Sequence, residues 1–337
     1  MLRIFFTSDD VARTRVAPGA DPVWELVLSL HLLRGRTRDP LMAGWRRTVA
    51  GSLRRGAHAS RLRLLLALNP PHGYFPDFLT PFDSREGLQQ GLDAIRATPA
   101  ANLRRDVTLL AAGNALPPSA AGLARGDAEV LRHLTESMEL YQELAIAPYW
   151  TRIQNAVEAD RGRRARVMLD DGAHGLLASL RPAMRWDGEV LEVSHYPVSR
   201  ELHLDGRGLL LVPSFFCART PVTLLDPDLP PVLVYPVDRL GGLGQAADAG
   251  AADPADRERE RGRQALAALL GKTRASVLEV VDGGRSTGEI ARLLDISPAA
   301  ASQHTTVLRN AGLLVSHRDR NTMLHTLTPL GRAMLDR

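Results

Sequence analysis

The sequence predicts an α+β fold: a mainly helical N-terminal domain with a small antiparallel sheet, and a smaller C-terminal domain of helices and one β-hairpin. Three patterns support this prediction. Apolar residues recur at helical spacing from residue 22 to about 180, and short β-rich runs bounded by Gly, Pro and Asp follow up to residue 240. A segment of low apolar content then separates these parts from the C-terminal domain.

The N-terminal part begins with residues 1–16, which have the pattern of a strand or a short lead-in, and is predicted to be mainly helical over 1–181. Four residues of its first helix share one face at i, i+3, i+4 and i+7 spacing, namely Trp24, Val27, Leu28 and His31. Further helices are predicted at 40–55, 58–68, 85–97, 100–111, 127–145, 148–160 and 162–180. The proline-rich segment 70–77 between them is expected to be a loop.

Residues 182–240 are β-rich, and their short runs between turn residues predict a small antiparallel sheet. Residues 241–263 combine glycines with mixed charges and few apolar side chains, so they cannot bury a core and are expected to be a linker. The predicted domains are therefore 1–240 and 264–337.

The C-terminal domain has the signals of two short helices joined by a tight turn. Ser286 and Glu289 form a capping box at the start of the first helix. Ser297 caps the second helix, Pro298 takes its first position and Gly312 ends it. This arrangement is a helix-turn-helix, whose second helix can lie in the major groove of DNA. Two short strands, 313–317 and 322–327, then predict a hairpin that would serve as a wing.

The second helix separates an inner face from a small, polar outer face that carries no carboxylate. Ala301, Thr305 and Leu308 are expected to point inward. On the outer face Gln303 could bind an adenine, and Ser302 a base or a phosphate. The predicted DNA-contacting residues, including those at the wing tip, are Ser297, Ala299, Ala300, Ser302, Gln303, His304, Thr306, Arg309, Arg318, Arg320 and Asn321. The alternative is a winged helix used only for protein contacts.

The run from Ser286 to Gly331 resembles the ArsR family of winged-helix repressors, particularly in Ser297-Pro298, Ser302-Gln303-His304 and Leu308-Arg309-Asn310-Ala311-Gly312-Leu313. Segments 211–215 and 233–236 resemble the long N-terminal extension of unknown function in some actinobacterial members. The resemblance implies a homodimeric repressor released from double-stranded DNA by a metal or a small molecule. The family's metal sensors carry paired cysteines on the first helix of the motif; because 286–294 has none, thiolate metal sensing is not expected. Thr305 also departs from the family, which has a large aliphatic residue there.

Composition and charge narrow the class of protein. The net charge is +4, and residues 264–337 contain 9 Lys and Arg against 6 Asp and Glu, which permits contact with nucleic acid. The single cysteine, Cys217, lies in the apolar run 213–217 and is expected to be a core residue rather than a redox switch. Because it is alone, an internal disulfide is excluded, which fits a reducing compartment. No stretch approaches the roughly 20 apolar residues that cross a bilayer. We therefore expect a cytoplasmic protein with no membrane partner.

The sequence predicts no cofactor and no metal site, and it does not predict an enzyme. The histidines of the N-terminal region show no metal-ligand spacing. His317 and His325 could pair across the hairpin and bind a metal with a third ligand, but they are expected only to shield the strand backbone. The sequence has no phosphate-binding loop or nucleophile elbow. Asp160 and the pair Asp170-Asp171 are interpreted as parts of a solvated charged helix rather than catalytic carboxylates. Tyr149 and Trp150 are the predicted ligand-binding residues, as the wall of a pocket; core packing is the alternative.

These patterns predict a sequence-specific DNA-binding transcriptional regulator. The first hypothesis is a homodimeric repressor whose N-terminal domain helps to dimerise and binds a small organic effector. The second is an effector-independent regulator in which that domain is a dimerisation or protein-partner platform. The third is an enzyme fused to a DNA-binding domain. A convergent set of catalytic groups in 1–240 would distinguish this hypothesis from the other two.

Overall fold

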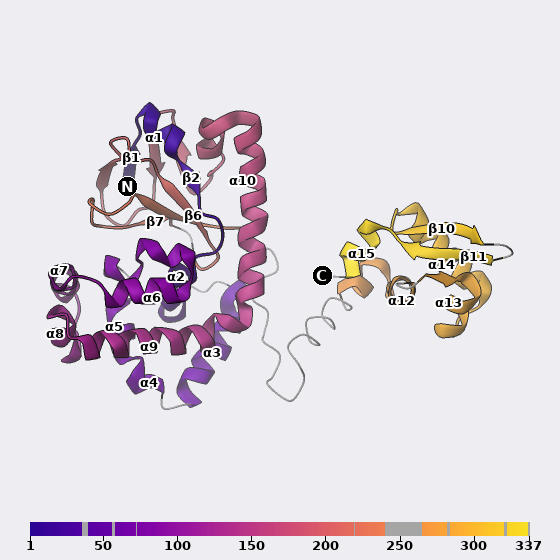
Figure 1. The fold of residues 1–337 in the computed structure, drawn as a ribbon, viewed down its shortest axis with the longest axis horizontal. Helices are drawn as coiled ribbons and strands as arrows, with labels where there is room; N and C mark the ends of the chain where they lie inside the picture. The colour runs from indigo at the N-terminus through magenta and orange to yellow at the C-terminus, as the bar shows by residue number, and fades with distance from the viewer. Residues whose placement is uncertain are drawn as a thin grey trace. The chain divides into compact units, whose positions relative to one another are not determined.

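The computed structural model describes residues 1–35, 40–55, 58–71, 73–218, 220–239, 265–281, 284–319 and 322–335. The chain divides into two compact units, unit 1 (Met1–Ala247) and unit 2 (Asp248–Arg337) (Figure 1). Both units contain helices and short sheets, which confirms the predicted α+β class. The predicted linker 241–263 lies outside the described residues.

The predicted helices of unit 1 are present in the predicted order, together with two short helices, Ser8–Arg13 and Ser119–Ala124, that were not predicted. Their bounds are α1 Ser8–Arg13, α2 Pro22–Arg34, α3 Ala43–Arg55, α4 His58–Arg61, α5 Arg63–Leu68, α6 Leu88–Arg96, α7 Ala100–Ala111, α8 Ser119–Ala124, α9 Ala128–Ala145 and α10 Trp150–Ala178. The helix expected over 58–68 is two short helices, and the two expected over 148–160 and 162–180 are joined in α10. Helix α9 is central to this layer, since it contacts α2, α3, α5, α6 and α8.

Helix α2 is the most deeply buried element of the layer. Asp21 caps it by accepting hydrogen bonds from the Val23 and Trp24 amides, both at 3.0 Å, and Pro22 occupies its first turn. Residues all around the helix are buried, including Glu25 and Ser29. A helix that is buried on every side needs no single apolar face, so the face predicted from four residues is only part of its contact surface.

The strands of unit 1 form two four-stranded sheets, in the orders β3-β4-β1-β5 and β2-β6-β8-β7. Their bounds are β1 Leu2–Phe5, β2 Arg15–Val16, β3 Arg185–Trp186, β4 Val190–Val193, β5 Arg200–His203, β6 Leu210–Ser214, β7 Val222–Thr223 and β8 Val232–Pro236. The strand or lead-in predicted over 1–16 consists of two strands, β1 and β2, one in each sheet, and the helix α1 between them was not predicted.

The sheets are mixed, so the expectation of one antiparallel sheet over 182–240 is wrong in its pairing. Strand β1 pairs antiparallel with β4 but parallel with β5, and β6 pairs parallel with β8. The physical reason is burial on both faces of β6 and β8. Val212 and Val234 point into the core of the helical layer, whereas Leu211 and Leu233 point into a second core between the sheets and α10. Continuous apolar runs of this kind are typical of buried parallel strands.

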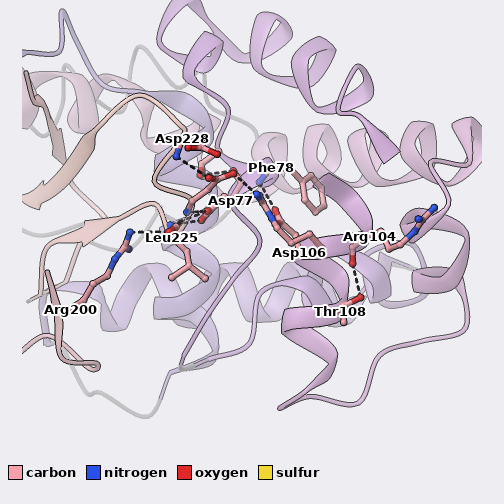
Figure 2. Close-up of polar contacts among 11 residues, drawn as sticks. Asp77, Phe78, Arg104, Asp106, Thr108, Arg200, Leu225 and Asp228 are labelled. Atoms are coloured by element: carbon pink, nitrogen blue, oxygen red, sulfur yellow. Dashed lines mark hydrogen bonds and ion pairs between the residues drawn. The ribbon is translucent and has the colours of Figure 1, made fainter. Parts of the chain in front are cut away.

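Buried carboxylates join the helical layer to the loops of the sheets. Glu25, on α2, accepts hydrogen bonds from the Phe215 and Phe216 amides at 2.7 and 2.9 Å, just after β6. Figure 2 shows a second case, in which the Asp77 carboxylate accepts from the Leu225 amide at 2.9 Å. Because these amides have no strand partner, the carboxylates satisfy donors that would otherwise be buried and unpaired.

Two predictions about the rest of unit 1 can be compared with its structure. Cys217 is buried, and this burial raises the pKa of its thiol to about 12, as expected for a core cysteine. Asp160 is also buried, so a solvated helix is the wrong interpretation for that residue; Asp170 and Asp171 are exposed as expected. None of the helices within the described residues has the length and apolarity needed to span a membrane.

Unit 2 has four labelled helices and one three-stranded sheet, of order β10-β11-β9. Their bounds are α12 Lys272–Val280, β9 Arg285–Ser286, α13 Thr287–Leu293, α14 Pro298–Asn310, β10 Leu314–Asp319, β11 Thr322–Leu327 and α15 Pro329–Leu335. A further helical segment, 265–270, precedes α12. One apolar core lies beneath these elements and includes residues from α12, α13, α14 and β10.

Candidate nucleic-acid interface

Helices α13 and α14 are joined by the tight turn expected at Asp295. Asp295 has a φ of +50°, a left-handed conformation that Asp tolerates better than most residues. The turn is closed by the Ile296 amide, which donates to the Ala291 carbonyl at 3.0 Å. The capping box is confirmed: the Glu289 carboxylate accepts from the Ser286 amide at 2.8 Å, and the Ser286 hydroxyl accepts from the Glu289 amide at 3.3 Å.

The inner face of α14 is as predicted. Ala301, Thr305 and Leu308 are all buried in the core of unit 2 or beside it. The Thr305 hydroxyl donates to the Ala301 carbonyl at 2.9 Å. This bond explains how a threonine occupies a position that the resemblance fills with an aliphatic residue: its hydroxyl is satisfied within the helix, and its methyl group remains for packing.

The outer face of α14 holds the predicted DNA-contacting residues of the helix. Ala299, Ser302, Gln303 and Arg309 are exposed, whereas Ala300, His304 and Thr306 are half-buried. Ser297 is exposed at the helix start and caps it by accepting from the Ala300 amide at 3.1 Å. The structure therefore presents a small, polar surface without carboxylates along this face, compatible with close approach to a polyanion.

Val307 and His304 also bear on the outer face of α14. Val307 is 39% exposed and was not among the predicted contacts, although it lies four residues after Gln303 and so on the same face. An apolar side chain there could contact a thymine methyl group. His304 has a buried Nδ1 atom with no hydrogen-bond partner among the described residues.

The wing is the antiparallel pair β10 and β11, in a register that runs from Leu314 opposite Leu327 to Asp319 opposite Thr322. Arg318 is exposed near its tip. The other predicted wing contacts, Arg320 and Asn321, lie outside the described residues. The short strand β9 pairs with β11 and so connects the wing to the start of α13.

His325 fixes the wing to the helix-turn-helix. Its Nε2 is hydrogen-bonded to the Thr287 hydroxyl at 2.9 Å, on α13, and its Nδ1 to the Ser316 hydroxyl at 2.8 Å, on β10. Burial, and then the charge of Arg309, lower its pKa below 6.5. Because both ring nitrogens are engaged, and because its cross-strand neighbour is Ser316 rather than His317, this histidine has a structural role that its sequence context did not reveal.

Helix α15 closes the domain through an unusually close backbone contact. A Cβ atom added at Gly331 would lie 2.2 Å from the Leu313 carbonyl oxygen, at the turn between α14 and β10. Thr328 stabilises the same turn, since its hydroxyl donates to the Gly312 carbonyl at 2.7 Å. The end of α14 is therefore held between α15 and the base of the wing.

The predicted ligand-binding residues of unit 1 lie elsewhere. Tyr149 is 5% exposed and belongs to the core of the helical layer, and Trp150 packs against that core. Neither residue lines the cavity beside Asp160 and Tyr235 or a smaller one beside Leu202 and Val232. Their placement agrees with core packing, the alternative interpretation, because a wide aromatic surface at the start of α10 is covered by neighbouring helices.

Residues 269–317 match the family model of a helix-turn-helix domain. The match extends from just before α12 to His317 in β10 and so includes the whole of α13, the turn and α14. No curated protein and no solved structure matches the chain. Together with the geometry, the match shows that the chain carries a DNA-binding helix-turn-helix domain of a kind found in transcription regulators; the resemblance to the ArsR family stays a prediction.

Proposed function

We propose that the protein is a sequence-specific transcriptional regulator and that α14 enters the major groove of double-stranded DNA. The observation that carries the proposal is the outer face of α14, whose exposed and half-buried side chains are mostly small or polar and include no carboxylate. With 13 residues the helix is about 20 Å long, enough to follow the groove past several base pairs. Its first amides, near Ser297, are suited to a phosphate oxygen.

Each exposed group has a distinct part in this arrangement. Ser302 and Gln303 contact base edges, because they lie in the first two turns of the helix. Arg309 and Arg318 contact phosphates on either side of the groove. His325 keeps the wing in place relative to α13 and thereby holds Arg318 at its distance from α14.

We further propose that the protein acts as a homodimer and represses transcription. A single recognition helix contacts only a few base pairs, whereas two helices about 34 Å apart contact successive major grooves on one face of the duplex. The resemblance of 286–331 to dimeric repressors supports both the homodimer and repression rather than activation. A protein bound across a promoter in this way excludes the polymerase.

Unit 1 is proposed to support dimerisation and to bind a small organic effector rather than to catalyse a reaction. Its buried carboxylates Glu25, Asp77 and Asp160 each accept hydrogen bonds that hold the fold together, which leaves them poorly suited to proton transfer. An effector that favours a dimer with displaced recognition helices would lower the affinity for DNA by a shift of populations. If unit 1 is instead only a partner platform, no small molecule will raise its melting temperature.

The binding half of this proposal is tested by gel shift with DNA from the promoter region of the protein's own gene. Gln303→Ala removes a contact to a base edge and should cost about 1–3 kcal/mol of binding to the specific site. Arg318→Ala removes a phosphate contact, so it should weaken specific and non-specific binding alike and reduce the slope of log K against log salt by about one. Arg104→Ala, an exposed arginine of unit 1, is the control with the same change of charge.

The proposal holds if the first two variants lose affinity and the control does not. It fails if the protein shows no preference for any segment of that DNA. It also fails if all three variants bind as the unsubstituted protein does, because the surface that carries the proposal would then be irrelevant to binding.

A further inference from the structure

One cavity of unit 1 is an open cleft of about 670 Å³ beside α10. It is lined also by residues of β4 and β8, by residues 179–183 after α10, and by Ala218, Thr220 and Pro221 before β7. This volume is within the range of roughly 300–1,000 Å³ seen for small-molecule sites. Both α10 and the sheets belong to unit 1 (Figure 1), so the cleft lies entirely within that unit. None of the residues predicted from the sequence to bind a ligand lines it.

The cleft exists because α10 reverses direction. Gly172 has a φ of +66° and a ψ of −165°, which interrupts the helix. As a result the Arg164 guanidinium donates to the Ser179 hydroxyl at 2.8 Å, although fifteen residues of straight helix would separate the two positions by about 22 Å. The returning segment carries Arg181 back to the wall formed by Arg163 and Arg164.

The cationic wall is held by one buried carboxylate. Asp160 accepts a hydrogen bond from the Tyr235 hydroxyl at 2.6 Å and pairs with Arg163 at 3.0 Å and Arg164 at 3.3 Å. Its charge is thus offset by two guanidinium groups, which it fixes in position. The Nε atom of Arg164 is buried and has no acceptor among the described residues.

Arg181 has no such role in the fold. It is exposed, and it makes no hydrogen bond or ion pair within the described part of the chain. The lining residues carry three arginines against two carboxylates, Asp160 and Asp238, and therefore a net positive charge. Apolar groups such as Leu180 and Val193 line the same cleft and could contact a carbon skeleton.

We propose that this cleft is the binding site for a small organic anion that carries a carboxylate or phosphate group. Arg181, whose guanidinium has no partner among the described residues, binds the anionic group together with Arg163, in the planar geometry that suits both oxyanions. The proposal deepens the proposed function, on which it rests, by giving the effector a site and a chemical class. Binding would act on residues 179–183, which follow the segment of α10 that folds back from Gly172 and form one side of the cleft.

The test is a thermal shift measurement on the full-length protein without DNA. The probes are inorganic phosphate, sugar phosphates, and mono- and dicarboxylates at millimolar concentration, with neutral analogues of equal size for comparison. A ligand of the folded state raises the melting temperature, and titration of the best probe gives its Kd. The phosphate and carboxylate arms separate the two sources of the anionic group.

Arg181→Ala should weaken the best probe at least tenfold, and Arg181→Glu should abolish its effect. Arg166→Ala is the matched control: it is an exposed arginine of α10 that does not line the cleft, and it should leave the Kd unchanged. Circular dichroism of each variant verifies the fold. The inference is overturned if no anion stabilises the protein more than its neutral analogue, or if Arg181→Ala binds as tightly as Arg166→Ala.

Gel shifts on the same preparations separate this inference from the proposed function. Specific DNA binding without any stabilising anion would support the proposed regulator and refute the proposal of an anion site in the cleft. If an anion binds through Arg181 but the protein binds no specific DNA, the anion site is supported and the proposed regulator is refuted.

Discussion

Replacing His325 by alanine should destabilise unit 2 far more than replacing the neighbouring His317. His325 is 4% exposed, and its two ring nitrogens are hydrogen-bonded to Thr287 and Ser316, whereas His317 is exposed one strand away. His325→Ala removes both bonds and the packing of the ring. His317→Ala removes only a solvated side chain, so it serves as the matched control.

The size of the effect follows from these contacts. Two hydrogen bonds contribute roughly 1 kcal/mol each. The cavity left by the half-polar ring adds about 1 kcal/mol. We therefore expect His325→Ala to lower the free energy of unfolding of unit 2 by about 3 kcal/mol, and His317→Ala to change it by less than about 0.5 kcal/mol.

The same residue predicts a pH dependence. Burial, and then the charge of Arg309, lower the pKa of His325 below the 6.5 of the unfolded chain. Between these two values the unfolded chain binds the proton and the folded unit does not, so the stability of unit 2 falls as the pH drops below 6.5. One group of this kind contributes at most about 1.4 kcal/mol per pH unit, and His325→Ala should remove that contribution.

The assay can separate the two units because all four tryptophans lie in unit 1, at residues 24, 45, 150 and 186. Denaturant unfolding followed by tryptophan fluorescence therefore reports on unit 1, whereas far-ultraviolet circular dichroism reports on both. Hydrogen exchange of peptides from 284–335 locates the change. The reasoning is refuted if His325→Ala and His317→Ala have equal effects, or if the pH dependence of unit 2 survives in His325→Ala.

Three further predictions concern the packing and capping of the two units. Gly331→Ala should destabilise unit 2 by about 2 kcal/mol or more, because the added Cβ would clash with the Leu313 carbonyl. Gly288→Ala is the control: this glycine lies in α13 with no atom near the position of an added Cβ, so the change should be neutral or stabilising. Hydrogen exchange of unit 2 compares the two variants. Ser286→Ala should cost unit 2 about 1 kcal/mol through loss of the capping box, visible in urea unfolding followed by circular dichroism. Glu25→Gln should destabilise unit 1 by about 2 kcal/mol, because an amide group would face backbone N–H donors, and a lower urea midpoint in tryptophan fluorescence would show it.

The helix-turn-helix was predictable from its sequence because its signals are local. A hydroxyl cap three residues before a carboxylate, a serine before a proline and a glycine after the last turn each specify a helix end within a few residues. The burial of Thr305 follows from its spacing from Ala301 and Leu308. In this unit the local preferences and the tertiary contacts agree.

The sheets of unit 1 were not predictable to the same degree, because their pairing is set by residues far apart in the chain. Strand β1 lies between β4 and β5, which are nearly 200 residues away, and nothing near Leu2 specifies that position. The parallel pair β6 and β8 left a signal in their continuous apolar runs, which the antiparallel prediction overlooked. The cleft beside α10 depends on a reversal at Gly172, in a stretch whose periodicity indicates only helix.

The most direct test of the proposed function is a genome-wide map of the sites that the protein occupies. We predict discrete sites upstream of genes, each with two inverted half-sites about 10 base pairs apart or a multiple of that spacing, and loss of these sites in Gln303→Ala. Occupancy spread evenly over the genome, or a set of sites unaffected by Gln303→Ala, would contradict the proposal that α14 recognises a specific DNA sequence.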